Sequence, residues 1–539
     1  MVVKSLSATT GVPESVLRLL FTILLSYPLA LFYRFTFLRP LKTIWAPFLR
    51  NLYVVVTGLA LCYYHNGSDI KHSLIATIVT WIFCLIGDIV GNRTLSAISA
   101  FLFNIIYLTV GYYKVQNGDY GINWTMTQCV LCLRMIGFAM DFMDGEKLKK
   151  SKLSMASTHA KNSISSSPQK VGISTSRPQK QPISFEKNIQ LLDLPPLIET
   201  IGYAYFFGSF LIGPQFSFHL YRKFLTMSLF PDATRIPSGS YKSAMKSLFL
   251  GALYLGVYEI GSGYFPASYL ITADFASKPF INRLIIMWWV GKFSLTKYLG
   301  IWTLAEGASM LSGISFNGYD DHGNAEWNGL ANVDRWRFEF ATSLADIVGS
   351  FNTNTNLWVK TYVFKRLAFL GNKELSSIIS LLFLALWHGV CFGYYFCFSL
   401  EFFDVEIERR WAKRVESYTK PLYLPQNKNN PSIQFWRRIH QLVGWLGQTC
   451  ALHYAVVSFV LLKWEYIRIV YNSVHWIGHI IVFSLLLLDF ILPKHKKTSE
   501  VNNKMINGDN KMVNGDNKMI NGDDKMINGD IRNSSKKIN

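Results

Sequence analysis

The chain has 539 residues, of which 50% are hydrophobic, 15% aromatic and only 16% charged, and its formal net charge is +20. Soluble proteins carry about 25% charged residues, so the composition excludes an ordinary soluble protein. A net charge of this size would suggest a nucleic-acid partner in a soluble protein. No RNA-binding motif accompanies it here, and we predict a membrane protein with anionic lipid headgroups and no nucleic acid as partners.

Five apolar runs near 16–37, 44–63, 70–90, 95–114 and 124–143 predict membrane-spanning helices at the start of the chain. Runs of about 18 or more apolar residues are long enough to cross the hydrocarbon core of a bilayer. The first run is longer than the apolar part of a signal peptide, so we expect it to remain in the protein. Residues 1–143 are therefore predicted to form an N-terminal block of transmembrane helices.

The next segment, 144–190, has nine Lys or Arg residues against three acidic ones and is rich in Ser. It has no apolar stretch to bury, which favours a flexible loop. Basic loops of multi-span proteins lie preferentially in the cytosol. We predict a flexible basic cytosolic loop here.

The following part, 191–492, is predicted to form the transmembrane core of the protein. It has apolar runs near 197–217, 241–262, 281–312, 376–402, 441–463 and 470–492, with shorter amphipathic pieces at 220–231 and 356–370. A second basic segment, 405–440, has eight basic residues against three acidic ones and is expected in the cytosol. The fold class is all-α, a polytopic membrane protein of about eleven spanning helices.

The tail, 493–539, has ten basic and six acidic residues and repeats a seven-residue unit from KMINGDN at 504–510 onward. Asn-Gly and Gly-Asp steps favour turns, so we predict a disordered cytosolic tail. The chain ends Lys536-Lys537-Ile538-Asn539. Two lysines at these positions resemble the signal that returns membrane proteins to the endoplasmic reticulum. We therefore predict a multi-pass protein of that membrane with a cytosolic C-terminus.

Ionisable side chains inside the membrane are costly, so each is a candidate functional residue. The candidates are Asp88, Asp141, Glu259, Glu306, His388, His453, His475, His479 and Asp489. For most of them a helix end or a hydrogen bond between helices is the simpler explanation. His475 and His479 are four residues apart, but Trp476 replaces the Glu of a zinc-protease motif and no third ligand is evident. We predict hydrogen bonding between helices for this pair and no metal site.

His388 differs from the other candidates in its surroundings. It lies in the run SIISLLFLALWHGVCFGYYFCF, which predicts a helix with His388 in its middle. Gly389 and Gly393 would leave one helix face without side chains, so another group can approach closely there. A neutral imidazole in a dry cavity can accept a proton near neutral pH. This pattern suits a general base for a hydroxyl nucleophile.

Upstream, residues 350–358 read SFNTNTNLW, with Asn352, Asn354 and Asn356 in a dense neutral hydrogen-bonding cluster. A basic and aromatic stretch, KTYVFKRLAFLGNKE, follows and supplies cations that could bind phosphates. A polar turn with an interfacial basic helix explains the same segment equally well.

SFNTNTNLWVKTYVFKRLAFLGNKE followed by LLFLALWHG resembles the membrane-bound O-acyltransferase family, and within it the branch that acylates lysophosphatidylcholine. The family's motif has Asn, five residues and Trp, a spacing that Asn352 and Trp358 keep, although Phe351 replaces the usual preceding Trp. Residues 316–340 also resemble this branch. The strong match covers about 316–402.

The resemblance implies that His388 is catalytic and that Asn352 is its partner, in a reaction tunnel within the membrane. Acyl-CoA would enter from the cytosol as a co-substrate, with no cofactor, and a lysophospholipid would arrive from the bilayer. We expect substrate contacts from Asn356, Trp358, Lys365, Arg366 and Trp387. A homo-oligomer is compatible with the sequence.

Several alternatives stay open at this point. The acceptor of the family reaction could be diacylglycerol, a sterol or a protein. A transporter would also place His and Asn along a substrate path, although no inverted repeat of interrupted helices is evident. A scaffold without activity would not explain a lone His in an apolar helix. A covalent route through Cys391 lacks a neighbouring cation that would favour the thiolate.

Overall fold

The computed structural model describes residues 2–38, 43–115, 121–161, 183–185, 189–232 and 236–493. Met1–Leu486 form one compact unit and Leu487–Asn539 a second. The tail repeat, the dilysine end and most of the predicted 144–190 loop lie outside the described residues.

The described parts are built of α-helices and short 3-10 helices, with two isolated bridges in place of any sheet. The helices of the first part are α1 Val2–Thr10, α2 Glu14–Phe37, α3 Ala46–Asn66, η1 Gly67–Asp69, α4 Ile70–Val90, α5 Arg93–Val115, α6 Trp124–Lys161, η2 Ile183–Phe185, α7 Leu197–Ala204 and α8 Phe218–Leu225. Those of the second part are α9 Ser240–Tyr264, η3 Ala267–Ile271, α10 Ala273–Ser277, α11 Phe280–Ser312, α12 Arg335–Glu339, α13 Leu344–Ser350, α14 Thr353–Tyr362, η4 Phe364–Leu370, α15 Lys373–His388, α16 Phe392–Thr419, η5 Lys420–Tyr423, η6 Pro425–Asn427, α17 Pro431–Leu461, α18 Trp464–Ser473 and α19 Ile477–Ile491.

Among the described residues, five stretches are long and apolar enough to cross a membrane, or six if the bent pair α18 and α19 counts as one span. The five are Glu14–Phe37, Ala46–Val90, Arg93–Val115, Trp124–Lys150 and Pro431–Leu461. An all-α membrane protein is confirmed, whereas the count of about eleven spans stays a prediction.

Helix α6 continues well past the predicted start of the basic loop, to Lys161. After Gly145 its sequence has no Gly or Pro to end it. Lys150 and Glu146, four residues apart, form an ion pair of 2.6 Å that supports the helix. The cationic composition is therefore compatible with a helix in the part of the segment that the structure describes.

The run near 197–217, predicted to be one spanning helix, is broken: α7 ends at Ala204 and residues 205–217 form turns. Its carbonyl groups are no longer paired within a helix, and in a membrane protein they need other donors. The guanidinium of Arg134 on α6 supplies them, donating to the carbonyls of Tyr203, Ala204, Ser209 and Pro214 and to the Ser209 hydroxyl.

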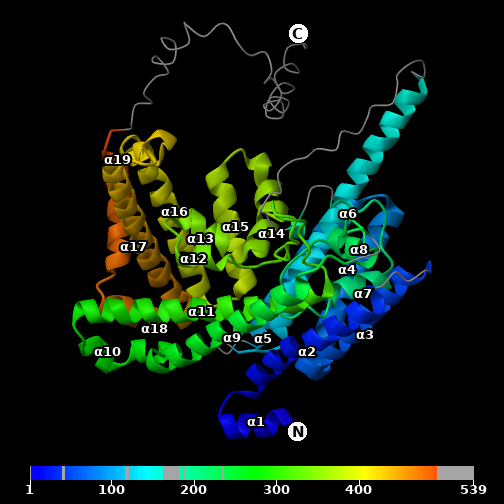
Figure 1. Cartoon of the computed structure of the whole chain (residues 1–539), viewed down its shortest axis with the longest axis horizontal. Helices are drawn as coiled ribbons and strands as arrows, with labels where there is room; N and C mark the ends of the chain where they lie inside the picture. The colour runs from blue at the N-terminus through cyan, green and yellow to red at the C-terminus, as the bar shows by residue number, and fades with distance from the viewer. Residues whose placement is uncertain are drawn as a thin grey trace. The chain divides into compact units, whose positions relative to one another are not determined.

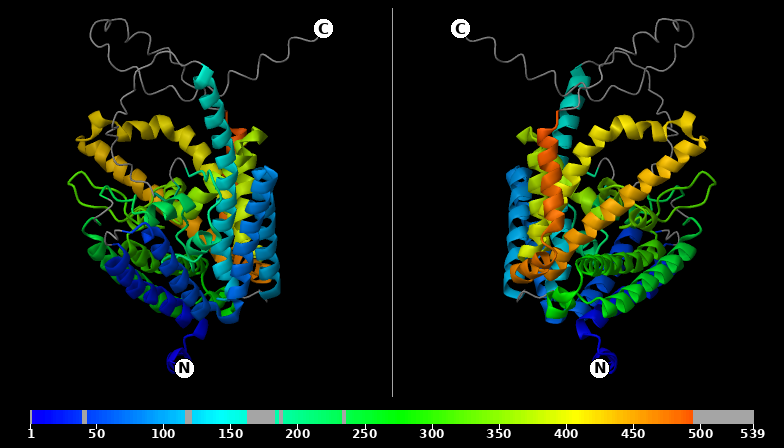
Figure 2. Two further views of the ribbon diagram at one scale, coloured as in Figure 1. Left: turned by 90° about the vertical axis from the view of Figure 1, so that its right-hand side faces the viewer. Right: turned by 90° about the vertical axis from the view of Figure 1, so that its left-hand side faces the viewer.

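The second half of the first unit packs around α9, α11 and a helical hairpin. Helices α9 and α11 run side by side (Figure 1). Figure 2 shows α16 and α17 joined as a hairpin through the short helices η5 and η6. Gly393 near the start of α16 lies against α17: a Cβ added there would stand 2.2 Å from the Ser458 carbonyl oxygen. The close approach expected at this glycine is confirmed.

The predicted helix over 376–402 is interrupted beside its histidine. Helix α15 ends at His388, and α16 begins at Phe392. Gly389 adopts a φ of 147°, which its lack of a Cβ allows, and ends the helix. His388 is thus the last residue of a helix and does not lie in the middle of one.

The predicted helix over 470–492 is also broken, with a bend of 80° between α18 and α19. His475 and Trp476 have φ of 54° and 53° and form the turn, so His475 and His479 do not share a helical face. His479 Nδ1 is hydrogen-bonded to the Tyr454 hydroxyl of α17 at 2.9 Å. Hydrogen bonding between helices is confirmed for His479, whereas His475 stacks on the ring of Phe280.

Candidate functional site

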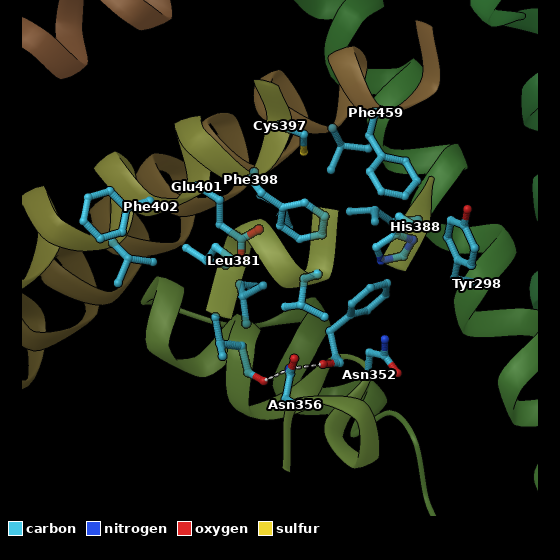
Figure 3. Close-up of a pocket in the computed structure, with 18 of the residues that line it drawn as sticks. Tyr298, Asn352, Asn356, Leu381, His388, Cys397, Phe398, Glu401, Phe402 and Phe459 are labelled. Atoms are coloured by element: carbon cyan, nitrogen blue, oxygen red, sulfur yellow. Dashed lines mark hydrogen bonds between the residues drawn. The ribbon is translucent and has the colours of Figure 1, made fainter. Parts of the chain in front are cut away.

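A cavity of about 1030 Å³ lies within the second half of the first unit. Its walls come mainly from α9, α11, α14, α15, α16 and α17, with further residues from α12, α13, η3 and η4, so segments from Tyr258 to Val460 meet around it. Its volume lies at the upper end of the ordinary range of small-molecule sites, about 300–1,000 Å³, so it can hold a large ligand. His388, Asn352 and Asn356 all line it, so the structure brings the main predicted site residues together (Figure 3).

His388 faces this cavity from the end of α15. The rings of Trp387, Tyr394, Phe398 and Phe459 surround its imidazole, with centroids 4.7 to 5.7 Å away. Among the described residues, neither imidazole nitrogen of His388 forms a hydrogen bond with a protein group. These ring contacts hold the imidazole in place at the cavity wall. The imidazole is therefore positioned to exchange a proton with a molecule in the cavity.

Asn352 lies immediately before α14 with a left-handed backbone, φ 49° and ψ 42°, a region that Asn adopts more readily than most residues. Its side-chain oxygen accepts a hydrogen bond of 3.0 Å from the amide of Asn332. Because that oxygen is engaged, the amide nitrogen is the part of Asn352 left to donate into the cavity. Figure 3 shows Asn352 on the same side of the cavity as His388, with Asn356 farther along the wall.

Two neighbouring asparagines hold this segment in place. Asn354 is buried and donates to the carbonyl of Ala331 at 3.1 Å. Asn356 donates to the carbonyls of Val348 and Phe351, at 2.8 and 2.9 Å. These bonds tie the start of α14 to the segment before it, so the predicted polar cluster is a framework that positions Asn352.

Trp358 and Trp387 are buried and do not line the cavity. The indole of Trp358 donates to the Leu133 carbonyl and that of Trp387 to the Cys129 carbonyl, at 2.9 and 2.8 Å. Both carbonyls belong to α6. The two tryptophans thus anchor α14 and α15, which carry the site, to the helix that precedes the basic loop.

The cations predicted to bind phosphates fall into two groups. Arg366 is ion-paired with Asp144 at 2.5 Å, and Lys365 is exposed outside the cavity lining. Lys360 and Lys373 do line the cavity, together with Arg409, which the sequence did not single out. Arg409 is paired with Glu406 at 2.5 Å. Lys360 and Lys373 are thus both exposed and part of the cavity lining.

Two further charged residues in the lining were missed by the sequence reasoning, Lys297 on α11 and Glu401 on α16. Both lie in apolar runs that were predicted to span the membrane, and this is the signal that could have identified them. In the view of Figure 3, Glu401 and Phe402 lie on one side of His388 and Tyr298, next to Lys297 in sequence, lies on the other. The lining therefore includes an ionisable residue on α11 and another on α16.

Comparison with known proteins agrees with this arrangement. Residues 109–464 match the model of the membrane-bound O-acyltransferase family. The chain is 38% identical to Lysophospholipid acyltransferase 5 from Homo sapiens over 90% of each chain. It is 33% identical to Lysophospholipid acyltransferase 5 from Drosophila melanogaster, over 88% of this chain and 86% of the relative. It is 28% identical to Lysophospholipid acyltransferase from Schizosaccharomyces pombe over the same shares. The matched region contains every helix that lines the cavity, and this chain belongs to the membrane-bound O-acyltransferase family.

Proposed function

We propose that this protein transfers a fatty acyl group from acyl-CoA to the sn-2 hydroxyl of a lysophospholipid, lysophosphatidylcholine in particular, in the membrane of the endoplasmic reticulum. The observation that carries the proposal is the meeting of His388 and Asn352 in one large cavity. The names of the relatives, all lysophospholipid acyltransferases, support the acceptor class. No cofactor takes part in the proposed reaction.

In the proposed mechanism His388 acts as a general base. Its neutral imidazole takes the proton from the sn-2 hydroxyl, whose oxygen attacks the thioester carbonyl carbon. The tetrahedral intermediate collapses with cleavage of the C–S bond, and the departing CoA sulfur receives the proton from the imidazolium. The amide of Asn352 donates to the oxyanion. A general base contributes about 10²–10⁴-fold to such a rate, and an oxyanion donor about 10²–10³-fold.

The location of His388 suits substrates that enter from different directions. Helix α15 runs from Lys373 to His388, which at 1.5 Å per residue corresponds to about 22 Å. The hydrocarbon core of a bilayer is about 30 Å thick, so a path of this length reaches well into it. Lys360 and Lys373 would attract the phosphates of CoA at the outer end, while the thioester reaches the histidine.

The test is acyl transfer from labelled polyunsaturated acyl-CoA to lysophosphatidylcholine, comparing purified wild type with His388→Ala. We expect transfer by wild type, at least 100-fold less by the variant, and an equal melting temperature. Transfer by both would overturn the mechanism. No transfer by folded wild type would overturn the acceptor, and diacylglycerol, sterol and protein acceptors would then be assayed in turn.

A further inference from the structure

Helix α16 contributes an acidic side chain to the cavity that the proposed mechanism does not use. Glu401 lies in the run of the sequence near 376–402 that was predicted to span the membrane, and it lines the cavity. Figure 3 shows Glu401 beside Phe398 and Leu381 on the cavity wall. An ionisable side chain is costly at such a position, and where it faces a cavity it marks a substrate path. Glu401 is therefore a candidate contact for a ligand.

The other acidic residues of the lining are neutralised within the protein. Glu374 and Glu406 both pair with Arg409, at 3.5 and 2.5 Å. Glu406 also pairs with Arg410 at 2.6 Å. Among the described residues, no hydrogen bond or ion pair engages the carboxyl group of Glu401. Its hydrogen-bonding capacity is therefore available to a molecule in the cavity.

Contacts on either side of Glu401 fix its depth in the cavity. Nearer the histidine, the ring of Phe398 packs against the imidazole of His388, with centroids 5.4 Å apart. Farther along α16, Arg409 meets Glu374 at the start of α15. Glu401 follows Phe398 by three residues and precedes Arg409 by eight, which at 1.5 Å per residue corresponds to about 4.5 and 12 Å along the helix. The carboxyl group therefore lies between the histidine and the outer end of the cavity.

The part of acyl-CoA that would lie at this depth is the pantetheine arm. This arm connects the thioester, proposed to lie at His388, to the phosphates, proposed to lie at the outer end. Its first amide nitrogen is three bonds from the sulfur, its second is seven and its phosphorus is thirteen. An extended chain advances about 1.2 Å per bond, so these atoms stand about 4, 8 and 16 Å from the sulfur. Since the ring of Phe398 already separates Glu401 from the imidazole, the second amide matches the depth of Glu401 better than the first.

The chemistry of this stretch of wall suits an amide N–H. An amide N–H that enters an apolar cavity needs an acceptor, and a carboxylate is an acceptor only. The neighbouring side chains of Leu381, Leu384 and Phe402 in the lining have no acceptor to offer. An acyl chain needs none, and a carboxylate repels phosphate. The amides are therefore the groups of acyl-CoA that Glu401 can serve.

The choline cation of a lysophosphatidylcholine is another group that a carboxylate attracts. That cation is joined to the lipid phosphate by a linker of two carbons, so the phosphate would approach the same carboxylate. Glu401 also lies between His388 and the start of α15, where Lys373 lines the cavity, and this is the proposed route of acyl-CoA. Both considerations favour the amide.

We propose that Glu401 accepts a hydrogen bond from the second amide of the pantetheine arm and so sets how far acyl-CoA reaches toward His388. This inference rests on the proposed use of acyl-CoA, but the binding can be measured without turnover. Glu401 is then a specificity-determining residue for the acyl donor. It recognises the arm between the thioester and the phosphates.

The experiment uses the full-length purified protein and two probes that differ in one N–H. The first is S-hexadecylpantetheine, and the second is its analogue with an ester oxygen in place of the second amide N–H. Both are thioethers and cannot transfer an acyl group. Binding is read from the ligand concentration that gives half of the maximal rise in melting temperature. The variants are Glu401→Met and Glu401→Gln, and Asp404→Asn is the control for loss of a buried carboxylate from α16 outside the cavity lining.

We expect wild type to bind the amide probe about 10-fold to 100-fold more tightly than the ester probe, the effect of one hydrogen bond to a charged group. In Glu401→Met the preference should fall below about 3-fold, because the charged acceptor is lost. Glu401→Gln keeps a neutral acceptor and should show an intermediate preference. Asp404→Asn should leave the preference unchanged. In turnover, Glu401→Met should raise the KM for acyl-CoA and leave that for lysophosphatidylcholine unchanged.

Equal binding of the two probes by wild type would overturn the inference, and this comparison needs no variant to fold. A preference that persists in folded Glu401→Met would overturn it as well. A higher KM for lysophosphatidylcholine alone would assign Glu401 to the choline cation and overturn the contact with the amide. An amide preference that depends on Glu401 in a wild-type protein without transferase activity would overturn the proposed function and leave the pantetheine contact standing. Normal transferase activity without the preference would overturn the contact alone.

Discussion

Arg134 and His388 are both ionisable residues within an apolar helical bundle. They differ in whether the protein itself satisfies their hydrogen-bonding groups. Arg134 is 1% exposed and makes five hydrogen bonds, all to one short stretch of chain. Nearby, Asp141 accepts a hydrogen bond from the Tyr362 hydroxyl at 2.8 Å. Around His388, in contrast, a cavity of about 1030 Å³ meets the side chain.

Buried polar groups in this membrane protein therefore fall into two kinds. A charge whose donors or acceptors are satisfied by the protein stabilises an irregular stretch of chain, as Arg134 does for residues 205–217. A polar group that faces a cavity is available to a ligand. Of the nine ionisable residues singled out in the sequence, only His388 lines the large cavity. The cavity, and not burial alone, separates His388 from the other eight candidates.

The largest effect is expected on stability, from replacing Arg134. Arg134→Met removes the donor of four buried carbonyl groups, and each buried acceptor left without a donor costs about 1–3 kcal/mol. We expect a large fall in the melting temperature of the purified protein, with little change in the KM for acyl-CoA of the fraction that stays folded. The measurements are thermal unfolding and steady-state kinetics.

Arg134→Lys is the control for this prediction. It keeps the charge, but its single nitrogen cannot serve all the carbonyls that the two terminal guanidinium nitrogens reach. An intermediate melting temperature is therefore expected. A melting temperature of Arg134→Met equal to that of wild type would show that these hydrogen bonds do not hold the segment.

The sequence identified His388 and Asn352 as candidates, but it did not predict the local structure around them. His388 and Asn352 could be found because one is a lone imidazole in an apolar run and both belong to motifs with a fixed spacing. The break at Gly389 could not, because hydrophobicity is continuous across it and the φ of 147° depends on tertiary packing. Asn332 was missed for a similar reason: it is one of many polar residues in a loop, and only the fold brings it to Asn352.

Some of the helices were predicted with accurate bounds, and others were not. The apolar runs near 70–90 and 281–312 agree closely with α4, Ile70–Val90, and α11, Phe280–Ser312. The run near 197–217 did not form one helix, because its interior carbonyls found Arg134 as a partner from a distant segment. The periodicity and length of an apolar run reflect local helix preference. They contain no information on a hydrogen-bond donor that belongs to another helix.

The second prediction concerns the pair Asn352 and Asn332. Asn352→Ala should lower kcat for acyl transfer by about 10²–10³-fold, since it removes the proposed oxyanion donor. Asn332→Ala removes the bond that orients Asn352, together with the oxygen that accepts two bonds from Asn354. A fall of about 2–10-fold in kcat is expected from the lost orientation, a net contribution of about 0.5–1.5 kcal/mol. Single-turnover kinetics with saturating substrates would measure both.

The double variant tests whether the two asparagines act in one chain. If Asn332 works by orienting Asn352, then adding Asn332→Ala to Asn352→Ala should lower kcat no further. Additive losses would instead indicate that Asn332 affects the reaction by another route. Asn356→Ala removes the donor of the backbone carbonyls of Val348 and Phe351 and should lower the melting temperature.

The smallest effect is expected at the outer end of the cavity, where exposed cations would meet the phosphates of CoA. Lys373→Gln should raise the KM for acyl-CoA by about 2–5-fold, the range of exposed charge pairs worth about 0.2–1 kcal/mol. Lys365→Gln makes the same change in charge at an exposed residue outside the lining, and should leave this KM unchanged. Because salt screens exposed charges, raising the ionic strength should increase the KM of wild type and of Lys365→Gln more than that of Lys373→Gln. An increase in KM caused by Lys365→Gln and not by Lys373→Gln would move the CoA phosphates to the other face of this segment, where Lys365 lies, and would separate the entrance for acyl-CoA from the cavity that holds His388.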